Sequence, residues 1–167
     1  ALGHELKIGL DAIRGTLGDF EGVKRRFERK GEPGGVLVVD DYGHHPTEIA
    51  ATLQTAKTLE RKKLVVVFQP HRYSRTQALM DNFADCLNMA DHLVLMDIYP
   101  ASEKSIEGVT TEALAERIRA KRPQELVHLP KEAIVDHLMG IVGPGDLVVT
   151  LGAGDVTRIS DELVKRL

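Results

Sequence analysis

The sequence has a single cysteine, Cys86, among its 167 residues, which excludes an intrachain disulfide framework and is compatible with a reducing cytoplasm. Cys86 shares a helix-like apolar stripe with Leu79, Phe83 and Leu87, so we expect a buried structural thiol rather than a reactive one. The sequence also lacks any apolar stretch of transmembrane length and any recognisable signal peptide. We therefore expect a cytoplasmic protein without a membrane segment.

A second feature that is lacking is a large excess of charge of one sign. The formal net charge is -3, with 22 Lys and Arg against 25 Asp and Glu, so the chain as a whole does not attract nucleic acid or an anionic membrane. The basic run over residues 24–30 is accordingly interpreted as a solvated strand, and neither nucleic acid nor membrane is an expected partner. A composition of 43% hydrophobic and 28% charged residues indicates one globular domain, with room for a small appendage.

A third absence concerns phosphate binding. Nowhere does the sequence contain the Gly-Lys-Ser/Thr ending of a phosphate-binding loop. If the protein uses ATP, the main grip on the phosphates must therefore come from elsewhere. The sequence also begins at Ala1, without an initiator Met and within what reads as a helix, so we expect a fragment of a longer protein.

Short apolar runs alternate with segments of helical spacing from residue 36 onwards. The runs cover residues 36–39, 64–68, 93–96, 126–129 and 147–151. This alternation predicts βαβ units, and fully apolar runs are typical of parallel strands that are buried on both faces. Because crossovers between parallel strands are right-handed, we predict an α/β fold with a doubly wound, mainly parallel sheet and helices on both sides.

The start of the chain follows a different pattern. Residues 6–17 have the spacing of an amphipathic helix, which Gly15 and the next two glycines should break. Residues 23–29 then alternate in polarity, and a Gly/Pro turn over residues 31–35 precedes the first apolar run. We therefore predict one antiparallel edge strand over residues 23–29, paired with residues 36–39.

The densest polar stretch is residues 40–45, at a predicted strand-to-helix turn with two acids, an aromatic, a glycine and two histidines. In open α/β sheets, ligands bind at the carboxyl ends of the strands. We predict a ligand-contact turn in which Tyr42 stacks on a ring and Asp41 accepts hydrogen bonds. Either His44 or His45 would donate to an anion, since adjacent histidines point in different directions. The alternative is a turn whose Asp caps the next helix and whose histidines are merely solvated.

A second polar stretch, residues 69–76, directly follows the second apolar run. Arg72 and Arg75 are three positions apart, which on an opening helix places both guanidinium groups on one side. Two such groups at a helix N-terminus form a strong site for a carboxylate or a phosphate. A solvated charged face is the alternative, but arginine there opposes the helix dipole, and that cost favours a function.

The third stretch, residues 151–155, follows the last apolar run and contains Gly152, Ala153 and Gly154. Small residues at this position let the backbone approach a ligand closely. The stretch does not match a dinucleotide-binding fingerprint, because Thr157 occupies the position of the third glycine. A tight strand-to-helix turn would explain the glycines equally well.

Two weaker features lie on the same predicted edge of the sheet. Residues 97–101 follow the third apolar run and could line a cleft. A metal site is conceivable but matches no known spacing, so no metal site is predicted. Its candidate ligands would be Asp40, Asp41, His44, His45 and His71.

Taken together, these motifs resemble those of the Mur ligase family, and the resemblance extends over nearly the whole chain. The motifs that carry it are residues 22–27, 40–48, 68–76, 99–101 and 152–155. Family members have an N-terminal UDP-sugar domain, a central ATPase domain with the phosphate loop, and a C-terminal Rossmann-like domain. The resemblance implies that residues 21–167 are the C-terminal domain and residues 1–20 the tail of the central domain with its linker, which would account for the missing phosphate loop.

Within the family, the motifs are most similar to those of members that join L-alanine to UDP-N-acetylmuramate in peptidoglycan synthesis. The resemblance implies that the full enzyme uses ATP and Mg²⁺ to form an acyl phosphate, which L-alanine then attacks. His71, Arg72 and Arg75 would hold the alanine carboxylate or nearby substrate anions. The remaining substrate-binding positions, expected near the reacting centre, are His44, Gly152 and Ala153.

The resemblance also implies that Asp41 and Tyr42 reach the ATP nucleotide. It assigns neither a catalytic residue nor a metal ligand to this chain. ATP, Mg²⁺ and both other substrates would be shared with the two missing domains, so we expect this domain alone to be inactive and to hold no cofactor. Positioning and charge neutralisation at the acyl phosphate would do most of the catalytic work.

Three other functions remain open from the sequence. A recycling ligase of the same family adds a whole tripeptide and shares the Asp-His-His-Pro-Thr signature, but its second motif resembles Glu-Pro-Arg-Ser-Asn-Thr. Residues 69–75 read Gln-Pro-His-Arg-Tyr-Ser-Arg instead, which favours the alanine enzyme. The chain could otherwise be a free-standing nucleotide-binding module or a docking domain.

Overall fold

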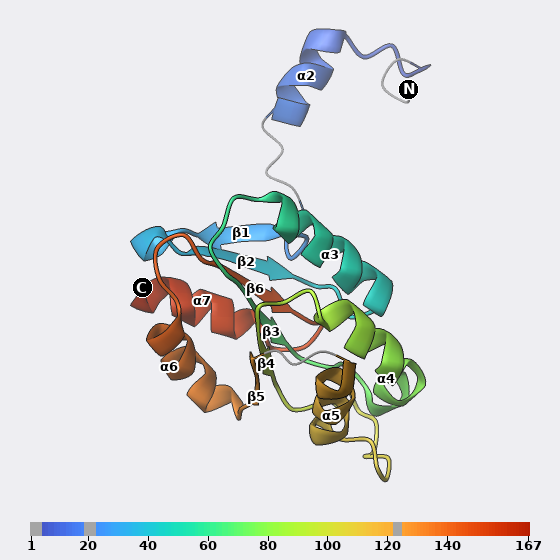
Figure 1. The fold of residues 1–167 in the computed structure, drawn as a ribbon. Coiled ribbons are helices and arrows are strands. Elements are labelled where there is room, and N and C mark those ends of the chain that lie inside the picture. The colour runs from blue at the N-terminus through green and yellow to red at the C-terminus, as the bar shows by residue number, and fades with distance from the viewer. Residues whose placement is uncertain (1–4, 19–22, 122–124) are drawn as a thin grey trace.

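A single mixed sheet forms the centre of the domain in the computed structural model, which describes residues 5–18, 23–121 and 125–167 (Figure 1). The sheet has six strands in the order β1-β2-β6-β3-β4-β5. The strands are β1 (Glu28–Gly31), β2 (Leu37–Asp41), β3 (Leu64–Phe68), β4 (His92–Leu95), β5 (Glu125–His128) and β6 (Leu147–Leu151). Only β1 pairs antiparallel, with β2, and the other four pairings are parallel.

Helices cover both faces of this sheet (Figure 1). The helical elements are α2 (Leu10–Gly18), η1 (Pro33–Gly35), α3 (Pro46–Thr58), α4 (Tyr73–Leu87), α5 (Thr111–Lys121), α6 (Lys131–Ile141) and α7 (Thr157–Arg166). Successive strand residues enter opposite cores: Leu64 and Val66 pack with α3, α4 and α5, whereas Val65 and Val67 pack with α6 and α7. The predicted doubly wound sheet with an antiparallel edge is therefore confirmed.

The predicted edge strand has the right partner but the wrong bounds. We expected it over residues 23–29, whereas β1 is Glu28–Gly31 and pairs Glu28 with Asp40. Arg25 and Phe27 have φ angles of 58° and 48°, so the chain turns where alternating polarity implied an extended strand. The prediction failed because these residues serve the neighbouring turn rather than the ladder.

The break expected at Gly15 is also absent, since α2 runs through this residue to Gly18. No residue of α2 is buried, and Leu10 and Leu17 remain 64% and 67% exposed. Figure 1 shows α2 set apart from the sheet and its covering helices. The thiol of Cys86, by contrast, is buried as expected, and burial raises its pKa to about 12.

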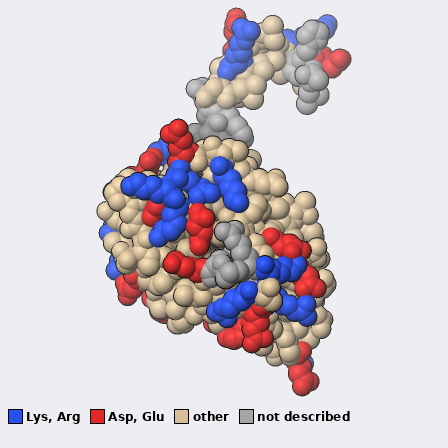
Figure 2. Space-filling model, in the orientation of Figure 1, with Lys and Arg blue, Asp and Glu red and all other residues tan. Residues whose placement is uncertain are grey.

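Charged side chains of both signs share the surface. Figure 2 shows Lys and Arg next to Asp and Glu on the face that it displays. Ion pairs account for part of this mixing, among them Arg117 with Asp81 and Lys30 with Asp161. Within the described part of the chain, none of the helices has the length and apolar character needed to cross a membrane.

The sheet order places three polar turns side by side. β6 lies between β2 and β3, so its last residue, Leu151, is level with both Asp41 and Phe68. The turns that follow these strands therefore leave the sheet at one edge, at adjacent positions. This crossover order is the topological switch point at which open α/β sheets bind ligands.

A glycine allows the turn after β6 to approach the end of β3. Gly152 has a φ angle of 145°, and a Cβ added to it would lie 2.8 Å from the backbone oxygen of Gln69. No other residue type fits this position without moving the backbone of one of the two turns.

We predict that Gly152→Ala lowers the free energy of unfolding by about 1–3 kcal/mol, because the new methyl group collides with backbone rather than with a flexible side chain. The control is Gly140→Ala within α6, where nothing lies within 4 Å of the added Cβ. This control should raise the free energy of unfolding by up to about 1 kcal/mol. Urea titrations of both variants measure the difference, and equal stability of the two would contradict the assignment.

A histidine pair lies at the opposite edge of the sheet, where β4 and β5 begin. His92 is buried, with Nδ1 2.9 Å from a carboxylate oxygen of Glu125 and Nε2 3.0 Å from Nε2 of His137. Burial, followed by the neighbouring His92, lowers the pKa of His137 below its ordinary value of 6.5. Folding therefore disfavours the protonated form of His137.

This pair predicts a loss of stability as the pH falls. Below about pH 6.5 the unfolded chain binds a proton at His137 that the folded chain does not, so the free energy of unfolding decreases. His71, whose pKa is also lowered, contributes in the same direction. We expect His137→Gln to make the decrease between about pH 6.5 and 5 shallower without abolishing it. Urea unfolding at a series of pH values tests this, and identical slopes for variant and wild type would refute it.

Candidate functional site

The three predicted polar turns meet at the carboxyl edge of the sheet. The backbone N–H of Gly152 donates to the carbonyl of Asp41 over 3.2 Å, and that of Gln69 donates to Leu151 over 3.0 Å. The side chain of Gln69 also accepts a hydrogen bond from the N–H of Val156 over 3.2 Å. Residues predicted separately as candidate sites thus form one continuous surface.

A partly buried ion pair holds this surface together. Asp40 is fully buried, and its carboxylate lies 2.9 Å from Nε of Arg25 and accepts the hydroxyl of Thr150 over 2.6 Å. The same guanidinium group donates to the carbonyl of Gly152 over 2.5 Å. Sequence reasoning missed Arg25, because it placed this residue in a solvated basic strand. The only signal that marked it was its position within the family motif at residues 22–27.

The carboxylate of Asp41 shapes the turn after β2. One of its oxygens accepts the N–H of Phe27 and the other the N–H of Gly43, each over 2.7 Å. The side chain is 8% exposed and borders a cavity of about 240 Å³. The other residues around this cavity are Arg26, Tyr42, Gly43, Glu48, Ala51 and Thr52.

Tyr42 projects from this turn as a partly exposed ring. Its side chain is 43% exposed, with the guanidinium carbon of Arg25 5.0 Å from the ring centroid. His44 meets the ring edge-on, with the two centroids 5.3 Å apart. The tyrosine is therefore supported from the protein side and keeps exposed surface, and its contact with a ligand stays a prediction.

The two adjacent histidines have different roles. Thr47 donates its backbone N–H to Nδ1 of His45, which caps α3, and Glu48 completes the capping box by accepting the N–H of His45. The ring of His44 points the other way, 5.9 Å from the ring of His71. Only His44 thus joins the convergent turns, and the residue that caps α3 is His45 rather than an aspartate.

His71 lies at the centre of the site. Its ring stacks on Tyr99 at 5.5 Å and 10°, and Arg75 donates to its Nδ1 over 3.3 Å. Burial, followed by the charges of Arg75, His44 and Arg72, lowers the pKa of His71, which is therefore mostly neutral at pH 7. Within the described ranges, Arg75 forms no ion pair with a carboxylate.

Arg72 is placed differently from the prediction. We expected Arg72 and Arg75 on an opening helix, but α4 begins at Tyr73 and Arg72 precedes it with a φ angle of 75°. Sequence reasoning also missed Glu103, whose carboxylate lies 3.6 Å from the Arg72 guanidinium group and accepts the N–H and hydroxyl of Ser74 over 3.0 and 2.7 Å. This carboxylate at the N-terminus of α4 offsets the unfavourable effect of the arginines on the helix dipole.

The turn after β6 is used mainly by the protein itself. The carboxylate of Asp155 accepts a hydrogen bond from Gln69 over 2.8 Å and pairs with Lys131. Both backbone groups of Gly152 are also engaged, its N–H by Asp41 and its carbonyl by Arg25. Ala153 is partly exposed. The tight-turn interpretation thus accounts for Gly152, and the substrate role of Gly152 and Ala153 stays a prediction.

The geometry does not support the conceivable metal site. Asp40 is paired with Arg25, the Asp41 oxygens are held by backbone N–H groups, and His45 caps α3. Among residues 5–18, 23–121 and 125–167, no group of three or more His, Cys, Asp or Glu side chains is arranged to hold a metal ion.

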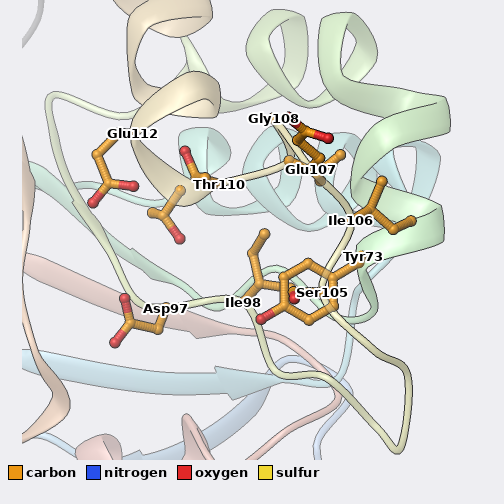
Figure 3. A pocket seen from close by; sticks show the side chains of 11 residues that line it. Tyr73, Asp97, Ile98, Ser105, Ile106, Glu107, Gly108, Thr110 and Glu112 are labelled. Carbon is orange, nitrogen blue, oxygen red and sulfur yellow. The ribbon is translucent and has the colours of Figure 1, made fainter.

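Another cavity lies beside the site rather than in it. Its volume is about 530 Å³, and it is bounded by the start of α4, residues 97–98 and 105–110, and the start of α5. Figure 3 shows the ring of Tyr73 beside Ile98, with Asp97 and Glu112 at the other end. Residues 97–101 thus divide: the first two line this cavity, whereas Tyr99 supports His71.

The chain matches a protein-family model and is similar to several known proteins. Residues 25–154 match the family model described as Mur ligase, glutamate ligase domain. The chain is 50% identical over 168 residues to UDP-N-acetylmuramate--L-alanine ligase of Geotalea uraniireducens, and 50% identical over 169 residues to that of Salinibacter ruber. All of this chain is covered, but only 37% and 36% of those relatives, so the chain spans about a third of their length.

Solved structures agree with the fold. UDP-N-acetylmuramate-alanine ligase from Thermotoga maritima matches with a TM-score of 0.75 and 30% identity, covering 99% of this chain and 35% of that one. A murein peptide ligase from Psychrobacter arcticus matches with a TM-score of 0.71 and 25% identity, covering 96% of this chain and 34% of that one. Because the family model covers most of the sequence, including the turns that build the site, this chain belongs to the Mur ligase family.

Proposed function

We propose that this chain is the amino-acid-binding C-terminal domain of a cytoplasmic ligase that joins L-alanine to UDP-N-acetylmuramate in peptidoglycan synthesis. The observation that carries the proposal is Arg75, a partly buried guanidinium group with a neutral histidine beside it and no carboxylate paired with it in the described ranges. Such a group calls for an anion from outside the domain. The identity to UDP-N-acetylmuramate--L-alanine ligases over the whole chain supports the amino acid's carboxylate as that anion.

Arg72 and Arg75 would form a clamp that binds a carboxylate through charge and geometry. Arg72, held near Glu103, and Arg75, held on His71, would contact the L-alanine carboxylate from two sides. The ATP-derived acyl phosphate of UDP-N-acetylmuramate would then meet the amine near His44, with Gly152 and Ala153 bordering the reacting centre. The domain contributes by positioning the amine and neutralising charge, which is where most of the rate enhancement would arise.

The nucleotide would extend over the turn after β2. The base of ATP would stack on Tyr42, beside the cavity of about 240 Å³ that Asp41 and Arg26 also line. The described residues offer no cluster of metal ligands, so Mg²⁺ would be held by the preceding domain together with the phosphates. The absence of a phosphate loop in this sequence fits the same division of labour.

Residues 1–20 would be the tail of the central ATPase domain, and residues 21–167 the C-terminal domain. The apolar side chains of α2 support this boundary, since none of the described ones is buried. The tripeptide-adding ligase is disfavoured by the motif at residues 69–75. It is disfavoured further because the murein peptide ligase structure is 25% identical, against 30% for the alanine ligase structure. The isolated domain should be inactive.

A prediction for the two arginines uses a complete ligase, made by joining this chain to the rest of the Geotalea uraniireducens relative. Arg72→Ala removes a charge-assisted hydrogen bond of about 1.5–3 kcal/mol, so the KM for L-alanine should rise about 10- to 100-fold. The KM for ATP should change little. Arg72→Lys should restore only part of the loss, because a lysine cannot form the two-pronged contact.

The control for this prediction is Arg117→Ala, which removes an exposed arginine of α5 that pairs with Asp81. Its kinetics should match those of the wild type. Steady-state phosphate release at varied L-alanine measures all four proteins. An unchanged KM for L-alanine in Arg72→Ala would show that the clamp assignment is wrong.

A separate prediction tests the nucleotide contact. Tyr42→Ala should raise the KM for ATP by about tenfold, since stacking of an aromatic side chain on a base contributes about 1–3 kcal/mol. Tyr42→Phe keeps the ring and should behave like the wild type. If alanine and phenylalanine at this position gave the same KM for ATP, the ring would not contact the nucleotide.

A further inference from the structure

The hydrogen bonds of the site fix where the ring proton of His44 lies. Its Nδ1 is 3.1 Å from the carbonyl oxygen of Tyr42. A carbonyl oxygen can only accept a hydrogen bond, so Nδ1 carries the hydrogen and neutral His44 has its lone pair on Nε2. Within residues 5–18, 23–121 and 125–167, no protein group forms a hydrogen bond with that Nε2.

His71 has the opposite arrangement. Arg75 lies 3.3 Å from Nδ1 of this ring, and a guanidinium group can only donate. The lone pair of neutral His71 is therefore on Nδ1 and its hydrogen is on Nε2. Two rings whose centroids are 5.9 Å apart thus present one proton acceptor, on His44, and one hydrogen-bond donor, on His71.

We propose that Nε2 of His44 is the general base that takes a proton from the ammonium group of the incoming amino acid, an inference that rests on the proposed function. An amino acid at neutral pH carries –NH₃⁺, which has no lone pair for attack on an acyl carbon. The carboxylate of the amino acid would bind Arg75, which contacts His71. The ammonium nitrogen is two bonds from the carboxylate carbon, so it would lie close to the same place. Of the two rings that border this point, only His44 has a lone pair that is not already in a hydrogen bond.

The step balances without a further reactant. The ammonium nitrogen gives one proton to Nε2 of His44, and its new lone pair attacks the acyl carbon of the acyl phosphate. The bond between that carbon and the phosphate oxygen breaks, and the second proton of the nitrogen leaves with the phosphate as HPO₄²⁻. The amide is formed, and His44 returns its proton to solvent.

Several charged and titratable groups surround His44. Glu48 of α3 lies 3.7 Å from Nδ1 of His44. His45 precedes α3, and His71 with Arg75 faces the His44 ring from the turn after β3. Tyr42 contacts the ring edge-on.

The test separates nucleophiles that need a base from one that does not. In the complete ligase described above, His44→Gln should lower kcat with L-alanine by about 100- to 10,000-fold, the usual contribution of a general base, and leave KM within about threefold. Hydroxylamine is unprotonated at neutral pH and intercepts acyl phosphates. Hydroxamate formation from ATP and UDP-N-acetylmuramate should therefore stay within about threefold of wild type.

The matched control is His45→Asn, which keeps a good capping residue on α3 and should leave both reactions unchanged. The pH profile gives an independent readout. Without the base, the rate of His44→Gln with L-alanine should rise tenfold per pH unit as free amine accumulates, whereas the wild-type rate should rise less steeply.

Each outcome is decisive. Equal loss of amide and hydroxamate formation in His44→Gln would mean that the residue positions the acyl phosphate, and the proposal would fail. Full activity of the variant with L-alanine would also overturn it. A wild-type complete ligase that releases no phosphate with L-alanine and UDP-N-acetylmuramate would refute the proposed function itself, which is a different result.

Discussion

The buried carboxylate of Asp40 is the constraint on which the functional edge of this domain depends. A carboxylate with no exposed surface costs several kcal/mol unless it is fully paired, and here Arg25 and Thr150 supply the pairing. Arg25 lies in the segment before β1, and its Nη2 donates to the carbonyl of Gly152 after β6. One guanidinium group therefore fixes the segment before β1 and the ends of β2 and β6 relative to one another. The turns with the candidate ligand contacts begin at these strand ends, so their starting points are held in place.

Because Asp40 is directed inward, the neighbouring Asp41 is the acid that shapes the turn after β2. With Asp40 directed inward, Asp41 uses both oxygens on the N–H groups of Phe27 and Gly43. That turn then carries Tyr42 and His44 outward, while the proline-led start of α3 uses His45 as its cap. Two adjacent histidines with different surroundings are the result, and the difference is set by backbone geometry rather than by the side chains themselves.

Periodicity predicted the sheet well because strands such as β3 and β6 are apolar on both faces and can pair only in the interior. It failed at Arg25, where alternating polarity resembled a strand but the chain turns to reach Asp40, a contact between positions 15 residues apart that no local pattern encodes. Glu103 was missed for the same reason. Its partners Arg72 and Ser74 are distant in sequence, and a single glutamate in a loop carries no signal. The turns were predictable, but the partners of their side chains were not.

The charges of the site favour an anionic ligand. Arg72 shares Glu103 with the start of α4, whereas Arg75 faces His71, whose pKa is lowered first by burial and then by the charges of the two arginines and His44. Adding a proton to His71 would increase the positive charge beside Arg75, which forms no ion pair with a carboxylate within the described ranges, so His71 stays neutral next to a positive arginine. An arriving carboxylate relieves that imbalance and does not consume the lone pair of His44. Under the proposed function, the domain would bind an anion and accept a proton in the same place, which is what an amino acid acting as a nucleophile requires.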